Sequence, residues 1–164
     1  GKYFIDAGHS TTIYNGEAVK ISSGYVVGGQ GSAADIVGVL NGIFFNAADT
    51  LKPTFSNFYK ATITPANSED TVAFVMDDPF QQYVVSSDDA RTQAQFLATY
   101  DMNTSAGSDT TGKSSATLDT SVTDADGKQF RLIRSAEDPE NEDITAAFFS
   151  GIVVSNLNSY NGHN

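Results

Sequence analysis

Short apolar runs, separated by turn-forming residues, recur along the whole chain. The strongest are residues 36–45 (IVGVLNGIFF), 71–76 (TVAFVM), 129–134 (QFRLIR) and 147–157 (AFFSGIVVSNL). Runs of this length predict strands, and apolar residues at consecutive positions are typical of a strand buried on both faces. The first run therefore predicts the central strand of a sheet, in which Gly38 and Gly42 mark bulges or close backbone approach.

A hairpin is predicted near the start of the chain. Residues 10–14 and 17–21 flank the dipeptide Asn15-Gly16, which favours the positive backbone angles of a type I′ turn. Residues 25–27 (YVV) predict a third strand, and the glycine-rich residues 28–32 predict a loop.

Proline-containing turns punctuate the later strands. Residues 54–59 alternate aromatic and polar side chains after Lys52-Pro53, which predicts another strand. Asp77-Asp78-Pro79 predicts a turn that leads into a strand at 80–85, because the residue before proline avoids the helical region and Asp accepts local hydrogen bonds. Asp138-Pro139 predicts a second such turn.

This spacing predicts an all-β fold: a single-domain antiparallel β-barrel or sandwich of about eight strands over residues 1–164. Residues 89–100 (DARTQAQFLATY) carry apolar positions at helical spacing, so either a short helix or an irregular connection is expected there, and at most one helix in all. Residues 103–115 are polar and of low complexity, which predicts an exposed loop.

Composition narrows the function classes. Nine Lys and Arg oppose 20 Asp and Glu, a formal charge of -11, so we expect no nucleic-acid partner, because gripping a phosphate backbone needs clustered cations. The 164 residues contain no Cys, which excludes disulfides, thiol nucleophiles and thiolate zinc sites. No apolar run approaches the roughly 20 residues that span a bilayer, so we expect no membrane association.

Residues 107–114 (GSDTTGKS) match the phosphate-loop pattern in letters. That motif works at a junction between a buried strand and a helix, where backbone N–H groups surround phosphates. Here the flanking segments 103–105 and 115–123 are polar or β-branched and predict neither element. We therefore interpret the match as a turn, and expect no nucleotide cofactor.

Carboxylate groupings offer two further candidates for chemistry. Asp124-Ala125-Asp126-Gly127 resembles the start of a calcium loop but lacks its later oxygen ligands and its bidentate Glu, so a turn is the better interpretation. The pairs Asp77-Asp78 and Asp88-Asp89 are candidates for acid–base or metal chemistry, although acidic pairs beside turns are usually only solvated.

The histidines do not complete a catalytic constellation. His9 and His163 both lie near the ends of the chain, and the sequence contains no nucleophile elbow or zinc-binding helix motif. We assign no catalytic, cofactor-binding or metal-binding residues, and expect a binding or structural module rather than an enzyme.

An ordered set of segments resembles a family of small virion-associated proteins of tailed bacteriophages, often from marine or cyanobacterial hosts. The segments are residues 12–20 (TIYNGEAVK), 37–39 with Gly42 and Phe44, 52–53, 56–59 (SNFY), 72–75 with 77–80 (DDPF), 93–96, 111–114, 131–134, 138–141 (DPEN) and 153–160. They cover the chain from about residue 10 to residue 160. The chain departs from the family pattern at residues 81–85 (QQYVV), directly after the Asp-Asp-Pro turn.

The resemblance implies a capsid decoration or cement protein that binds the outside of an assembled icosahedral head. It implies the major capsid protein as partner and supplies no catalytic residues. A protein that bridges capsid subunits on a symmetry axis is most simply a homo-oligomer, a trimer or a dimer. Exposed strands such as 80–85 are candidates for docking by edge pairing.

Two other functions remain open. A β-rich fibre, knob or adhesion domain would recognise a host surface through its aromatic residues, in few copies per particle. A hydrolase using Asp77 and Asp78 would lose its turnover in the Asp77→Asn variant.

Overall fold

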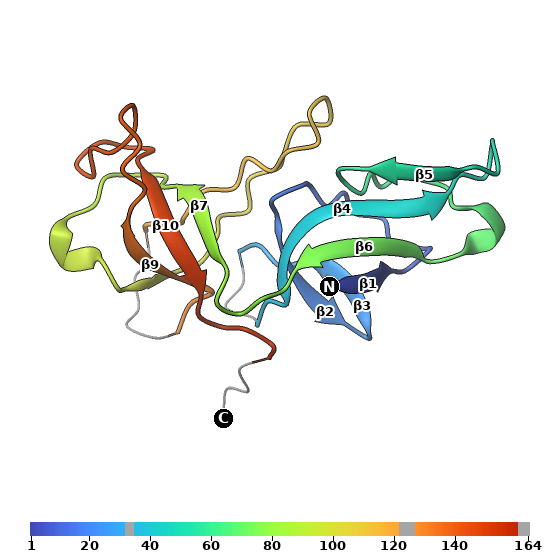
Figure 1. Ribbon diagram of the computed structural model, residues 1–164, viewed down its shortest axis with the longest axis horizontal. Helices are drawn as coiled ribbons and strands as arrows, with labels where there is room; N and C mark the ends of the chain where they lie inside the picture. Colours follow the sequence, from blue (N-terminus) through green and yellow to red (C-terminus); the bar gives the residue numbers. More distant parts are fainter. Residues whose placement is uncertain (32–34, 122–126, 161–164) are drawn as a thin grey trace. The chain divides into compact units, whose positions relative to one another are not determined.

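The computed structural model describes residues 1–31, 35–121 and 127–160. The regular secondary structure of these residues is nearly all β-strand (Figure 1). They form two antiparallel sheets, of six and four strands. Their only helical elements are two three-residue 3-10 turns, Ala66–Ser68 and Gln93–Gln95. The predicted all-β class is confirmed, with ten strands in the described part of the chain instead of about eight.

The chain divides into two compact units, each built from separated segments. Unit 1 consists of Gly1–Gly29, Val37–Asp77 and Ala106–Ser115, and unit 2 of Gln30–Ile36, Asp78–Ser105 and Ala116–Asn164. Each unit contains one of the two sheets. The single β-rich domain expected over residues 1–164 stays a prediction.

The sheet of unit 1 is organised around one long strand. Its strands are β1 (Lys2–Ile5), β2 (Ala18–Ser22), β3 (Tyr25–Gly28), β4 (Gly38–Asn46), β5 (Pro53–Ser56) and β6 (Thr71–Met76). The order is β1-β6-β4-β2-β3, and β5 pairs with the second half of β4 (Figure 1). The two outermost strands of this order, β1 and β3, also contact each other, so the sheet curls around its core.

The core of unit 1 lies on the inner face of this curled sheet. β4 is central, as its apolar run predicts, and places Leu40 and Ile43 at zero exposure. The cluster of buried apolar side chains around them comprises Ile5, Ile13, Val19, Val26, Val37, Leu40, Ile43, Tyr59, Ala73 and Val75.

Both glycines of β4 have the predicted roles. Leu40 pairs with Val75 but Gly42 pairs with Phe74, so Asn41 is the extra residue of a bulge. At Gly38, a Cβ atom would overlap the carbonyl group of Met76 on the paired strand. Close backbone approach therefore requires glycine at this position.

The predicted pairing of residues 10–14 with residues 17–21 is wrong. Asn15-Gly16 does form a turn, in which the Glu17 N–H donates to the Tyr14 carbonyl at 3.1 Å. Residues 10–14, however, form no strand, because the polar residues 10–12 have no apolar side chain to bury opposite β2, and only Ile13 makes an isolated bridge, to Tyr59.

The hairpin of β2 lies one turn later along the chain. β2 pairs with β3 through Ser23 and Gly24, whose φ values of 51° and 88° are those of a type I′ turn. A serine tolerates the positive φ only at a local cost, so the Ser-Gly dipeptide is a weaker sequence signal than Asn-Gly.

The sheet of unit 2 contains β7 (Gln82–Ser86), β8 (Thr99–Tyr100), β9 (Phe130–Ser135) and β10 (Ser150–Ser155), in the order β7-β10-β9-β8. Three of these strands were predicted, with shifted ends. The turns at Asp78-Pro79 and Asp138-Pro139 close as expected: the Gln81 N–H donates to the Asp78 carbonyl and the Asn141 N–H to the Asp138 carbonyl.

Residues 89–100 form an irregular connection, which was one of the two expected alternatives. Only Gln93–Gln95 turns, and the Thr92 N–H donates to Gln95 Oε1 at 2.9 Å. Thr99 and Tyr100 are fully buried strand residues, so tertiary burial outweighs the helical spacing there.

The two glycines of β4 provide a matched test of its register. Gly38→Ala forces a Cβ against a backbone carbonyl, so we expect a loss of unfolding free energy of about 2–3 kcal/mol. Gly42→Ala meets the exposed ring of Phe55 at 3.3 Å and the Ser56 carbonyl at 3.1 Å. Because alanine also suits a strand better than glycine, Gly42→Ala should stay within about 1 kcal/mol of wild type. Urea denaturation measures both, and equal losses would contradict this register.

Candidate binding surfaces

The two carboxylates of each acidic pair have different hydrogen-bond partners. Asp77 accepts hydrogen bonds from the amino group of Gly1 at 2.8 Å and from the Tyr3 hydroxyl at 2.7 Å, and these bonds lower the pKa of Asp77. Asp78 Oδ1 accepts instead from the N–H of Phe80 in its own turn. The two carboxylates therefore serve separate local structures.

The second pair has the same character. Asp88 Oδ1 accepts the Thr120 N–H at 3.0 Å, and Asp89 Oδ1 accepts the N–H of Ala90 at 2.7 Å. Throughout the described residues, no three His, Asp or Glu side chains are grouped so as to hold a metal ion. Asp124-Ala125-Asp126 and His163 lie outside the described residues.

In the segment resembling a phosphate loop, backbone N–H groups donate hydrogen bonds to carbonyl groups of the protein. The Ser108 N–H donates to the Lys113 carbonyl and the Gly112 N–H to the Ser108 carbonyl, at 2.9 and 2.6 Å. The Ser114 N–H donates to the Asn15 carbonyl at 2.9 Å. The strand nearest upstream is β8, which ends at Tyr100, and none of the described residues after this segment forms a helix. These amides are therefore occupied by protein carbonyls instead of facing a common centre.

This same segment is fixed to the rest of unit 1 by side chains. The Tyr14 hydroxyl donates to Asp109 Oδ1 at 2.8 Å, Lys60 Nζ lies 3.4 Å from Asp109 Oδ2, and the Asn57 amide donates to the Thr111 carbonyl at 2.8 Å. The ring of Tyr14 stacks on Phe58, with centroids 5.8 Å apart. Residues 107–114 are thus a docked part of unit 1.

His9 is held in a structural position. Its ring contacts Tyr59 with centroids 5.5 Å apart, its carbonyl accepts the Tyr59 hydroxyl at 2.8 Å, and its Nε2 is buried without a hydrogen-bond partner. Burial lowers the pKa of His9. His9 therefore contributes to the packing around Tyr59.

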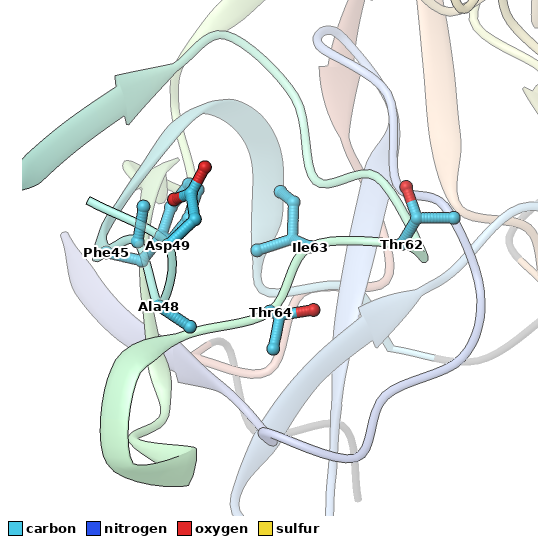
Figure 2. Close-up of a pocket in the computed structure, with 7 residues that line it drawn as sticks. Phe45, Ala48, Asp49, Thr62, Ile63 and Thr64 are labelled. Carbon is cyan, nitrogen blue, oxygen red and sulfur yellow. The ribbon is translucent and has the colours of Figure 1, made fainter. Parts of the chain in front are cut away.

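A pocket of about 630 Å³ lies at the end of β4 (Figure 2). Its lining residues are Phe45, Ala47, Ala48, Asp49, Thr62, Ile63 and Thr64. The hydroxyls of Thr62 and Thr64 do not converge with the Asp49 carboxylate on one point (Figure 2). The pocket therefore lacks the convergent polar groups that orient a small ligand.

The burial of two charged side chains could not be recognised from the sequence pattern. Glu17 is 8% exposed and Arg91 is 6% exposed. The Arg91 guanidinium lies 5.0 Å from the ring centroid of Tyr100, and its Nε and Nη2 have no hydrogen-bond partner. The Glu17 Oε2 accepts the Tyr14 N–H at 2.9 Å, and burial raises the pKa of Glu17 to about 7.

A row of four apolar side chains crosses the outer face of the sheet in unit 1. The register pairs Phe4 of β1 with Val72 of β6, Val72 with Phe44 of β4, and Phe44 with Phe55 of β5. Residues in register point to the same side of a sheet. Phe55 is 68% exposed and Phe4 is 45% exposed, so this row faces solvent.

A second aromatic ring extends this row. Phe74, which pairs with Gly42, stacks against Phe55 with centroids 5.7 Å apart. Gly42 leaves the space over which the Phe55 ring lies. We call Phe4, Phe44, Phe55, Val72 and Phe74 together the aromatic face.

Unit 2 exposes apolar side chains at different places. Phe80, in the turn before β7, is 80% exposed, and Val84 of β7 is 69% exposed. β7 lies at one edge of its sheet, and Val84 is in register with Ile152 of β10 and, through it, with Arg134 of β9. Leu97, in the connection before β8, is 59% exposed.

The two units differ strongly in charge. Unit 1 contains five lysines against seven carboxylates, a net charge of -2, and unit 2 contains four cations against thirteen carboxylates, a net charge of -9. Most of the acidity that was evident from composition therefore belongs to unit 2.

Comparison with known proteins adds no relative. No protein-family model matches the chain, and no curated protein or solved structure is significantly similar to it. Within the described residues, no helix has the length and apolarity that crossing a membrane requires. The class that the structure defines is an all-β protein with exposed apolar sheet surfaces.

Glu17 predicts a pH-dependent stability difference. Burial raises the pKa of Glu17 above the unfolded value of 4.5. Its contribution to the free energy of unfolding is therefore fully present below pH 4.5 and is lost as the pH rises through about 7. Glu17→Gln keeps an acceptor for Tyr14 and cannot ionise. We expect the variant to match wild type within about 1 kcal/mol at pH 4 and to be more stable by about 2–3 kcal/mol at pH 8. Urea midpoints at the two pH values measure this, and a pH-independent difference would contradict it.

Proposed function

We propose that the protein is a capsid decoration protein that binds the outside of an assembled icosahedral head and bridges neighbouring capsid subunits. The proposal rests on the ordered resemblance to virion-associated proteins between residues 10 and 160. The structural support is coarser: two β-sheet units with apolar side chains left exposed.

The structural observation that most supports the proposal is the exposed apolar surface at β7. Val84 of the edge strand β7 and Phe80 of the turn before it expose most of their side chains. Interfaces concentrate such side chains at their centres, surrounded by polar residues. This is also the segment in which the sequence predicts docking by an edge strand.

The net charge of unit 2 indicates the charge of the capsid surface that it would bind. With a net charge of -9, unit 2 favours a capsid patch that is rich in Lys and Arg. A protein that binds only the assembled head adds its binding free energy to the stability of that state. Decoration therefore requires preference for the assembled, expanded shell over loose subunits.

Host recognition by a fibre or knob is the second candidate, since exposed aromatic side chains also suit a surface receptor. Copy number separates the two, because decoration needs hundreds of copies per particle and a knob needs few.

Co-sedimentation with heads assembled without this protein tests the proposal. We expect wild type to bind expanded heads in hundreds of copies, and to bind less tightly as NaCl is raised from about 50 to about 500 mM. Val84→Asp should weaken binding at least about tenfold, because it places a charge at the centre of the contact.

Leu97→Asp is the matched control, since it adds the same charge to unit 2 at another exposed apolar position, and it should bind as wild type does. Equal loss in both variants would indicate a general charge effect and contradict a contact at β7. Absence of binding to heads would exclude the decoration function.

A further inference from the structure

One edge of β7 carries backbone groups that the sheet of unit 2 does not use. β7 is the first strand of the order β7-β10-β9-β8, so within the sheet it pairs only with β10. On the β10 side, the N–H of Ser87, directly after β7, donates to the Phe149 carbonyl at 3.0 Å. Because the residues of an antiparallel strand bond to its two sides alternately, Tyr83 and Val85 also face β10, whereas Val84 faces away from it. The Val84 N–H and carbonyl have no hydrogen-bond partner among the described residues.

The open part of this edge has defined ends. After β7, Leu118 already pairs with the edge, and its N–H donates to the Ser86 carbonyl at 2.9 Å. Before β7, the side-chain amide of Gln81 donates to the Gln82 carbonyl at 2.9 Å. The carbonyl groups on either side of Val84 along this edge are therefore satisfied by the chain itself. The open stretch lies between them.

The sequence of β7 offers no protection against pairing with another chain. Edge strands that avoid such pairing usually contain Lys or Pro, or are distorted by a bulge. β7 (QYVVS) contains neither residue, and its register with β10 is continuous over all five residues. Val84 is also largely exposed on the face that it shares with Ile152. Unpaired backbone groups beside an apolar side chain are the features by which an extended segment joins a sheet as a strand.

The charges of unit 2 indicate what kind of segment fits this edge. Asp78 lies in the turn before β7, and Asp88 and Asp89 follow the strand. Unit 2 as a whole has a net charge of -9. Pairing between the β7 edges of two copies would bring two such units together, so like charges oppose a second copy here. A segment that contains Lys or Arg is favoured instead.

We propose that the edge of β7 binds an extended segment of the capsid subunit that contains Lys or Arg, and that this segment joins the sheet of unit 2 as a further strand beside β7. The Val84 N–H donates to the backbone of the segment, and the Val84 carbonyl accepts a backbone N–H from it. An apolar side chain of the segment packs on Val84. This inference rests on the proposed function and specifies how the contact at β7 is made.

Proline substitution separates backbone pairing from side-chain contact. Val84→Pro removes the N–H that faces away from β10 but keeps an apolar side chain, and edge strands tolerate proline at such positions. In co-sedimentation with heads assembled without this protein, we expect Val84→Pro to bind at least about tenfold more weakly than wild type. Val84→Ile is the matched control, because it keeps both the N–H and a branched apolar side chain. It should bind within about threefold of wild type.

A second proline variant guards against a folding defect. Gln82→Pro removes the other N–H of this edge before Ser86, at the first residue of the strand, where proline is best tolerated. It should weaken binding severalfold, and circular dichroism and urea denaturation check that each variant folds. Wild-type binding by the folded proline variants would overturn strand addition and leave decoration standing. Absence of binding by wild type would overturn decoration, and this inference with it.

Limited trypsin treatment of the heads tests the occupant, because trypsin cleaves exposed extended segments after Lys and Arg. Treated heads that remain intact by negative-stain electron microscopy should bind wild type at least about tenfold more weakly than untreated heads. Equal binding to treated and untreated heads would overturn the assignment of an extended basic segment.

Discussion

The pairing of β4 with β2, β5 and β6 is the interaction on which unit 1 depends. One side of β4 buries Leu40 and Ile43 in the core, and the other side carries Phe44 on the outer face. On the outer side, Phe44 of β4 and Val72 of β6 are only half-buried, and Phe55 of β5 is largely exposed. An apolar surface of this kind is costly in water unless a partner covers it.

The two units differ in net charge and in where they expose apolar side chains. Unit 1 combines near-neutrality with the aromatic face, and unit 2 combines a net charge of -9 with apolar residues at one sheet edge.

The elements that were predictable from sequence are those with strong local signals. β4 and β6 follow continuous apolar runs, and the turns at Asp78-Pro79 and Asp138-Pro139 follow from proline and aspartate chemistry. The hairpin partner of β2 was not predictable from the sequence. Residues 10–14 and Tyr25–Gly28 are both short, and the stronger turn dipeptide, Asn15-Gly16, follows residues 10–14, which do not pair with β2.

The binding surfaces required the structure for a different reason. The aromatic face joins Phe4, Phe44, Phe55 and Phe74 from four strands, and only their register shows that they share one side. The burial of Glu17 and Arg91 likewise depends on distant segments, since neither residue stands in an apolar run. In the sequence, only the exposed segment 80–85 carried a local indication of docking.

Cryo-electron microscopy of decorated heads tests the central claim, that this chain acts by binding the outside of a capsid. The account predicts hundreds of copies on the outer surface, with the β7 region of unit 2 against the capsid lattice and neighbouring subunits bridged. Density confined to a tail, a fibre tip or a single vertex, or heads without any density for this chain, would contradict it.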